Sequence, residues 1–172
     1  MMKWTLIVII TILSILTAYY FFPEKQLPSN KKIKFINVSK NKRRMMVYSE
    51  ENALLKIYHI SLGKQPKGDK EFEGDMKTPE GKYFLNEKRK KSIYYKGFVI
   101  SYPDKKHIEN AKKLNKTAGG NILIHSIPDN WKWVGKFHRF VDWTNGCIAV
   151  TNDEMDELWE NIDVGTQITI TE

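Results

Sequence analysis

Cys147 and His125 are the two side chains of this sequence whose types could together perform nucleophilic catalysis. A free thiol has a pKa of about 8.5, so only a small fraction of it is thiolate at neutral pH. An imidazole beside the thiol can take its proton, provided that a partner on the other ring nitrogen fixes the tautomer. We expect the backbone carbonyl of Ser126 to be that partner. The predicted chemistry is acyl transfer through the sulfur of Cys147.

Gly146 comes directly before the thiol and leaves room for an acyl group to approach it. We expect the N–H groups of Gly146 and Cys147 to face the oxyanion that forms during attack. A plainer interpretation stays open, because a lone cysteine is usually a small buried side chain and His125 could simply belong to the core. With one cysteine, the chain can form neither an internal disulfide nor a zinc site with two thiolates. An unpaired thiol is a liability in an oxidising compartment, so its presence in an exported protein favours a functional role for Cys147.

Both residues lie at the ends of expected strands, where a rigid sheet can aim them. Residues 121–125 form an apolar strand that ends in the histidine, and 147–150 form one that begins with the cysteine. Apolar spacing predicts helices over 104–115 and from a capping box at Thr151–Glu154 onward. The other strands, expected from apolar patterns between turn signals, are 32–39, 45–48, 54–62, 81–85, 92–102 and 167–170. We predict a mostly β domain with two peripheral helices.

The segment from Trp4 to Phe22 carries no charged residue, and Pro23 follows it. Nineteen helical residues rise about 28 Å, the thickness of a bilayer's hydrocarbon core, and the aromatic residues that end the segment are typical of a membrane interface. We predict one transmembrane helix, and residues 1–23 are interpreted as an anchor or uncleaved signal because no small-x-small site follows. Residues 24–32 are interpreted as a tether and 33–172 as the folded domain.

The formal net charge of +8 would suit nucleic acid, an anionic membrane surface or an anionic polymer outside the cell. The basic runs at 40–44 and 88–91 lie beside expected turns, and no nucleic-acid-binding motif is visible. We therefore expect no nucleic-acid partner. Lysines flank both ends of the apolar segment, so charge alone leaves its orientation open.

Three stretches together carry a family resemblance. Residues 74–83 (GDMKTPEGKY) are similar to a G-x-x-x-T-P-x-G-x-[YF] loop and strand, and residues 144–148 (TNGCI) are similar to an [ST]-x-G-C-[IV] nucleophile motif. The apolar strand into Ile124-His125 lies between them. In this order, from about Ile33 to Ile170, the chain resembles the L,D-transpeptidase catalytic domain, the YkuD-like family.

The resemblance implies a β-sandwich-like fold and an acyl-enzyme mechanism with no metal or organic cofactor. Cys147 would be the nucleophile and His125 the general base, acting on the amide between an L-centre and a D-centre of a peptidoglycan stem. The acyl group would pass to an amine of another stem or to water. This function places the domain on the extracytoplasmic face of the bacterial inner membrane.

The sequence departs from the family pattern at three positions. Asn145 stands where His or Arg is usual, Ala149 where Arg or Asn is usual, and Ser126 where Gly often follows the histidine. These positions help to hold substrate in the family, so the acceptor stays open, and the wording DWTNGCIAVTN resembles a distinct branch in which hydrolysis of a wall-linked amide is possible. The residues assigned to substrate binding are His138, Arg139, Asn145, Thr144 and Tyr83.

His138 could replace the missing oxyanion donor, and Arg139 could hold a substrate carboxylate bidentately. A surface loop pair is the plainer interpretation, and Asp142 could orient either of them. His59 is interpreted as structural and His107 as solvated. We expect a group of aromatic residues to pack a long loop onto the sheet, or else to stack on sugars or cover the site; these are Trp131, Trp133, Phe137, Phe140 and Trp143. We expect a group of acidic residues to form a solvated loop, because they lack the spacing of a calcium site; these are Asp69, Glu71, Glu73 and Asp75.

Three functions compete. The first is the peptidoglycan acyltransferase or hydrolase described above. The second is a peptidoglycan-binding scaffold that keeps the fold without turnover, which an unreactive Cys147 would indicate. The third is a basic membrane protein that binds an anionic polymer, which binding that collapses with salt would indicate. The sequence leaves the acceptor, cleavage of residues 1–23 and the oligomeric state undetermined.

Overall fold

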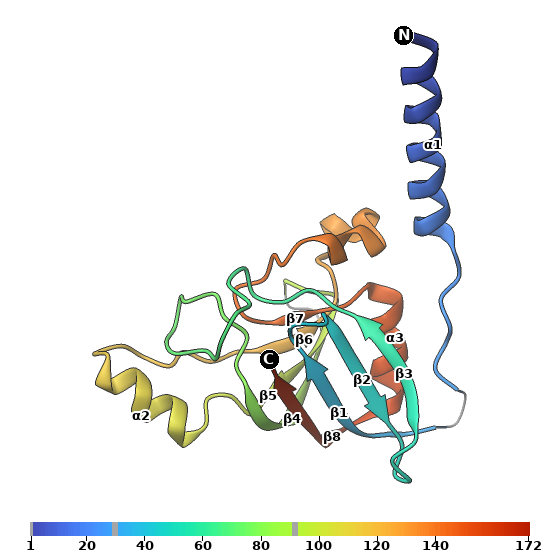
Figure 1. Ribbon diagram of the computed structural model, residues 1–172. Coiled ribbons are helices and arrows are strands. Elements are labelled where there is room, and N and C mark those ends of the chain that lie inside the picture. Colours follow the sequence, from blue (N-terminus) through green and yellow to red (C-terminus); the bar gives the residue numbers. More distant parts are fainter. Residues whose placement is uncertain (1, 29–30, 91–92) are drawn as a thin grey trace.

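The computed structural model describes residues 2–28, 31–90 and 93–172. A long helix projects from a domain built on one sheet (Figure 1). The elements in chain order are α1 (Met2–Phe21), β1 (Ile33–Ser39), β2 (Arg44–Tyr48), β3 (Leu54–His59), β4 (Gly81–Lys90), β5 (Lys96–Ile100), α2 (Lys105–Lys113), β6 (Leu123–His125), the 3-10 segment η1 (Asp129–Phe140), β7 (Ile148–Ala149), α3 (Asn152–Asn161) and β8 (Ile162–Thr171).

The sheet has eight strands in the order β3-β2-β1-β8-β4-β5-β6-β7. Most neighbours are antiparallel, but β8 runs parallel to β1 and β7 runs parallel to β6, so the sheet is mixed. Strand β1 shows why these segments are strands, since Ile36 and Val38 are buried while Phe35, Asn37 and Ser39 beside them are half-buried, as a period of two requires. The prediction of a mostly β domain is confirmed, with the sheet curled into a half-barrel.

The two peripheral helices are confirmed. The N-cap of α2 is Asp104, whose side chain accepts from the His107 N–H at 2.9 Å. At α3 the predicted capping box is present, with Thr151 and Glu154 exchanging their side-chain and backbone hydrogen bonds. Segment η1 was expected to be irregular loop and instead forms short 3-10 turns interrupted at Gly135, where φ is 49°.

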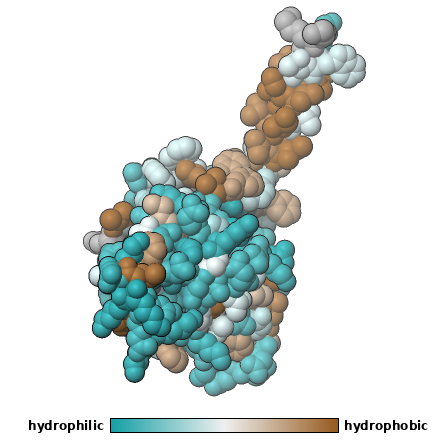
Figure 2. Space-filling view, turned by 60° about the vertical axis from the view of Figure 1, so that its left-hand side comes forward, coloured by the Kyte–Doolittle hydropathy of each residue, from teal (hydrophilic) through white to brown (hydrophobic). Residues whose placement is uncertain are grey.

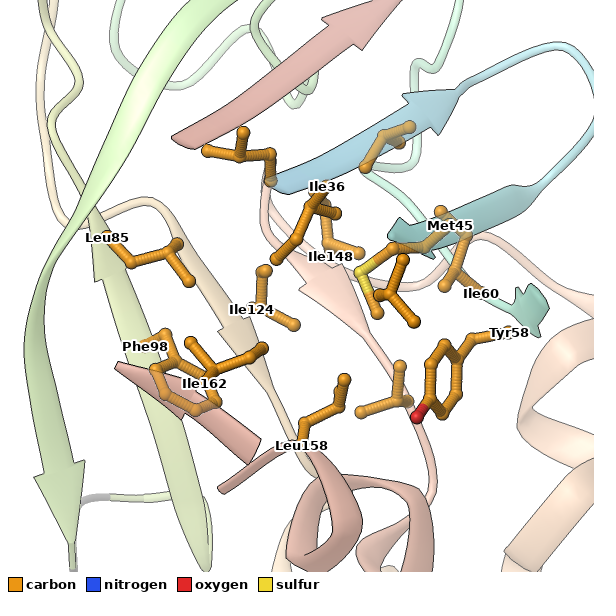
Figure 3. Close-up of a cluster of buried hydrophobic side chains, with 14 of the residues drawn as sticks. Ile36, Met45, Tyr58, Ile60, Leu85, Phe98, Ile124, Ile148, Leu158 and Ile162 are labelled. Carbon is orange, nitrogen blue, oxygen red and sulfur yellow. The ribbon is translucent and has the colours of Figure 1, made fainter. Parts of the chain in front are cut away.

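The core lies between the curled sheet and α3 (Figure 3). Ile124 of β6, Ile148 of β7 and Leu158 of α3 point into it and are fully buried. Burying such a side chain contributes roughly 1.5–3 kcal/mol, so β6 and the edge strand β7 are held firmly although they are short. This matters because the two strands carry His125 and the approach to Cys147.

Strand β8 is longer than expected. The prediction covered 167–170, whereas the strand begins at Ile162 and lies in the middle of the sheet between β1 and β4. The three residues after Ile162, Asp163–Gly165, are all exposed, so the first half lacks the apolar alternation on which the prediction depended. Strand β4 pairs only with residues 167–170, whereas the early start coincides with the pairing of Ile162 with Ile33 of β1, which is distant in sequence.

Helix α1 matches the predicted membrane span. It is 20 residues long, its residues Lys3–Phe21 are apolar enough to cross a membrane, and that segment is not buried by the rest of the chain. The described part of the tether packs on the domain, because Leu27 is buried and its N–H donates to the Glu157 carboxylate. Ser29 and Asn30, within the expected tether, lie outside the described residues.

Candidate active site

The sheet register puts Cys147 and His125 on the same face. Strands β6 and β7 pair Ile124 with Ile148 and His125 with Ala149. Ile124 and Ile148 point into the core, so the alternating side chains of His125 and Cys147 project to the opposite face. Parallel pairing thus places on one face a thiol and an imidazole that are well separated along the chain.

The backbone around β6 holds the sulfur of Cys147. The Leu123 N–H donates to Sγ at 3.4 Å, and the thiol donates to the Asn121 carbonyl at 3.7 Å. Burial raises the pKa of the Cys147 thiol, while the Leu123 N–H and the charge of Lys70 act in the opposite direction. The net shift is upward, so the resting group is a protonated thiol.

His125 has the tautomer that a base requires. Its Nδ1 lies 2.8 Å from the Ser126 carbonyl, which can only accept, so Nδ1 carries the proton. Its Nε2 is buried without a hydrogen-bond partner among the described residues. Burial lowers the pKa of His125 to about 4, and the bond to Ser126 only partly offsets this. The imidazole is therefore neutral at pH 7, with a free lone pair on Nε2.

Two aromatic rings enclose the imidazole. Tyr94 stacks on His125 with ring centroids 3.6 Å apart and an interplanar angle of 16°. Trp143 meets the ring edge-on at 5.5 Å. Burial, followed by the nearby Cys147, raises the pKa of Tyr94. The sequence analysis did not single out Tyr94, because its position beside His125 depends on a backbone bridge to Pro128, which is distant in sequence.

Thr144 organises the nucleophile loop. Its Oγ1 donates to the Cys147 carbonyl at 2.7 Å and accepts from the Gly146 N–H at 3.1 Å. The expectation that the Gly146 N–H faces an oxyanion is therefore wrong, because that donor is already used. Thr144 is buried, so its assignment to substrate binding is replaced by a role in holding the loop.

The T-P loop explains why glycines are needed here. Gly146 has φ of 129°, and a Cβ there would lie 2.7 Å from the Lys77 carbonyl. A Cβ on Gly63 would lie 2.1 Å from the Met76 carbonyl, and the Gly63 N–H donates to Thr78 Oγ1 at 3.0 Å. The first motif of the sequence thus packs directly against the third and fixes the loop that carries the thiol.

His138 and Arg139 are engaged away from the thiol. The hydroxyl of Ser61 donates to the His138 carbonyl at 2.8 Å, so it accepts from His138 Nδ1–H at 3.1 Å. His138 Nε2 then carries no proton, which contradicts the expected oxyanion donor. Arg139 is bound by Glu24 at 2.5 Å and by Glu154 at 2.7 Å, so its guanidinium is not free to hold a substrate carboxylate.

Three further expectations change. Tyr83 lies in the core and donates to the Glu80 carbonyl at 2.8 Å, so it does not contact the site. Asp142 does not orient His138 or Arg139, because it binds Arg43 in a bidentate pair. Asn145 is exposed on the nucleophile loop, where its side-chain oxygen accepts from Lys64 at 3.4 Å.

Glu71 and Glu73 of the acidic loop are exposed as expected, whereas His107, Asp69 and Asp75 are engaged inside the protein. His107 is buried, with Nδ1 2.6 Å from Asp104 and Nε2 3.1 Å from Asp69. Asp75 pairs with buried Lys70 at 2.6 Å. The loop is thus organised around the buried ammonium of Lys70 and the ring of His107. His59 is exposed at the end of β3, contrary to a structural role.

Two cavities flank this region. An apolar one of about 310 Å³ is lined by Trp131, Trp143, His138 and neighbours, and it adjoins His125 through Trp143. A larger one of about 1130 Å³ lies between the tether and α3 and is lined by neither Cys147 nor His125. Cys147 and His125 do not line the smaller cavity either, but its wall residue Trp143 contacts His125, so the smaller cavity lies nearer the candidate site.

Comparison with known proteins agrees with the geometry. The model of the L,D-transpeptidase catalytic domain, YkuD, matches residues 33–170. The chain is 29% identical over 132 residues to YafK of Escherichia coli K12, covering 73% of this chain and 46% of that protein. Bd1075 of Bdellovibrio bacteriovorus is 30% identical with a TM-score of 0.58, covering 85% of this chain and 51% of the other. Pgp2 of Campylobacter jejuni, described as a helical cell shape determining protein, is 25% identical with a TM-score of 0.62, covering 90% and 53%. The chain thus spans about half the length of these relatives.

Proposed function

Since this chain belongs to the L,D-transpeptidase catalytic domain family, we propose that it is a cysteine acyltransferase that acts on the stem peptides of peptidoglycan. The observation that carries this proposal is the state of His125. Its Nδ1 is fixed by the Ser126 carbonyl, its Nε2 lone pair is unpartnered among the described residues, and it shares a face with the Cys147 thiol. A satisfied core histidine would use both nitrogens.

The reaction starts from a neutral pair. The pKa of the thiol is raised and that of the imidazole is lowered to about 4, so a resting thiolate–imidazolium pair is disfavoured. As Sγ bonds to the carbonyl carbon between the L- and D-centres, the thiol proton moves to His125 Nε2. The carbonyl oxygen becomes an oxyanion. Of the two expected backbone donors, the Gly146 N–H is bound by Thr144, so the Cys147 N–H remains to stabilise it.

The intermediate then collapses to a thioester. The C–N bond breaks, and the proton on His125 passes to the leaving amine. An amine of a second stem attacks the thioester, gives its proton to His125 and forms a new amide. The proton returns to the departing sulfur, so the enzyme is regenerated with no net change. A water molecule in place of the amine gives hydrolysis.

Hydrolysis is the second candidate, and the loop geometry favours considering it. Asn145 and Ala149 replace residues that hold substrate in the family, and His138 and Arg139 are engaged elsewhere. A water molecule needs no dedicated acceptor site. A non-catalytic peptidoglycan-binding scaffold is the alternative of another class.

We place the domain outside the cytoplasm, tied to the bacterial inner membrane by α1. Helix α1 has the length and composition of a membrane span. The anchor would keep the domain close to the membrane side of the wall. Because the chain is similar to Pgp2, a helical cell shape determining protein, we propose that its remodelling of peptidoglycan affects cell shape.

The test incubates the full chain in detergent with isolated peptidoglycan, beside Cys147→Ala and His125→Ala, and reads the products by mass spectrometry. New cross-links or exchanged terminal residues that both variants lack support transpeptidation. Shortened stems formed with uptake of water support hydrolysis. Unchanged peptidoglycan, together with a thiol that no alkylating agent modifies, would contradict catalysis and leave the scaffold.

A further inference from the structure

Segment η1 carries apolar side chains that nothing in the described chain covers. Trp133 is 75% exposed, Phe140 and Val141 64%, and Trp131 50%. Other exposed apolar side chains of the domain, such as Ile93 and Phe84, are scattered over separate elements. Large aromatic residues that gather on one exposed segment mark a contact surface and not ordinary surface composition.

The position of this surface is fixed by the end of α1. Lys136 donates to the carbonyls of Tyr19 and Phe22, groups that a helix C-terminus leaves without partners. The hydroxyl of Tyr20 donates to the Trp133 carbonyl at 3.0 Å. In Figure 1 the orange turns of η1 lie beside the domain-facing end of α1. The segment is therefore level with the point where the helix would leave a bilayer.

Aromatic packing joins the two elements into one apolar surface. Phe137 stacks on Tyr19 at 6.1 Å and contacts Tyr20 at 5.2 Å, and Phe140 contacts Tyr19 at 5.4 Å. Figure 2 shows the apolar surface of the projecting helix continuing at its foot onto the adjacent part of the domain. Tryptophan, tyrosine and phenylalanine at this depth are the residues that prefer the headgroup region.

We propose that Trp131, Trp133 and Phe140 of η1, with Val141 directly after it, dock the domain onto the membrane surface beside its anchor. The inference rests on the proposed membrane location of α1. The occupant is the lipid interface, since the surface is continuous with a membrane span, and the exposed Lys132 adds attraction to anionic headgroups. Trp131 contacts Trp143 at 6.0 Å, and Trp143 meets His125, so docking holds the catalytic face at a set height above the bilayer.

The test measures depth in the membrane and uses no turnover, so it can fail independently of the proposed catalysis. The full chain carries Cys147→Ala, which leaves one added cysteine for a fluorescent label: Lys132→Cys on η1, Lys113→Cys on α2 as the matched control, or Leu6→Cys within α1. Each protein is placed in phosphatidylethanolamine–phosphatidylglycerol vesicles that contain doxyl-labelled lipid as quencher.

We expect the label at 132 to be quenched about twofold by shallow doxyl groups and the label at 113 to be almost unaffected. Adding Trp133→Ser and Phe140→Ser should abolish the quenching at 132 while quenching at 6 persists. Quenching at 6 without quenching at 132 overturns docking. Quenching at 132 that survives the double substitution overturns the role of these rings. Absence of quenching at 6 removes the anchor and the docking inference with it.

Discussion

Two buried histidines, His125 and His107, show how the same side chain serves opposite purposes in one fold. His107 lies between the carboxylates of Asp104 and Asp69 and uses both ring nitrogens. His125 has a single neutral partner, the Ser126 carbonyl, and its Nε2 is unpartnered among the described residues. Burial next to anions makes a histidine a structural link, whereas burial among neutral groups keeps it uncharged and ready to accept a proton.

The difference between His125 and His107 is tested most strongly by replacing each in turn with alanine and measuring turnover. His125→Ala should lower kcat/KM by about 10³-fold, because no base then takes the thiol proton. His107→Ala should leave turnover per folded molecule nearly unchanged. Equal losses in the two variants, measured on peptidoglycan fragments, would show that His125 acts through the fold alone.

Stability should respond in the opposite way. His107→Ala leaves Asp69 and Asp104 without their shared partner and opens a void, so the free energy of unfolding should fall by about 4 kcal/mol. Denaturant unfolding at pH 7 measures this. The exposed His59→Ala variant is the control and should change little. A loss below about 1 kcal/mol would mean that the carboxylates hold His107 weakly.

Lowering the pH should destabilise the protein through His125. The folded pKa of His125 is lowered to about 4 from 6.5, so the unfolded chain binds more protons between these values. The free energy of unfolding should therefore fall by about 3 kcal/mol through this group as the pH drops across that window. His125→Leu should remove this part of the pH dependence, as followed by denaturant unfolding at several pH values.

Asp69 and Asp104 act in a lower window. Burial raises their pKa values, but hydrogen bonds from backbone N–H groups and from His107 bring both below 3.8. The stability contributed by the two carboxylates is present above that value and is lost as the pH falls through the folded pKa.

For His125, the contradicting outcome is a His125→Leu variant whose stability falls as much as that of the wild-type protein between pH 6.5 and 4.

The smallest effect concerns the ring that covers His125. Since burial is the main cause of the lowered pKa, the acid limb of kcat/KM should lie near pH 4 in the wild-type protein. Tyr94→Ala admits water to the imidazole and should move that limb upward by about one pH unit. Tyr94→Phe keeps the stacked ring and is the matched control. An unmoved limb in Tyr94→Ala would show that other groups exclude the water.

Much of the fold was accessible from sequence because it depends on local patterns. The apolar alternation of β1, the capping box of α3 and the uncharged run of α1 each predict their own element. The nucleophile motif and the strand into His125 likewise point to the two residues proposed for catalysis. Family resemblance joined these two sites before the sheet register placed them on one face.

The errors share a physical origin in partners that are distant along the chain. Arg139 does not bind substrate as predicted, because it forms an ion pair with Glu24, which lies far away in the tether. His107 is not solvated as predicted, because Asp69 of another loop contacts it. Gly146 was given an oxyanion role, but its N–H is taken by a side chain two residues away. Such pairings are set by tertiary packing, which spacing alone does not reveal.

The central place of β8 also sets the order in which this domain can be assembled. β8 follows every other strand in the chain, yet it joins β1 on one side to β4 on the other. Apart from β8, β1–β3 and β4–β7 are linked only by short bridges such as Ser61–Ala149 among the described residues. We therefore expect the pairing of the two halves to be completed only by the last strand, and folding to be slow, because the contacts between β1 and β8 span most of the chain.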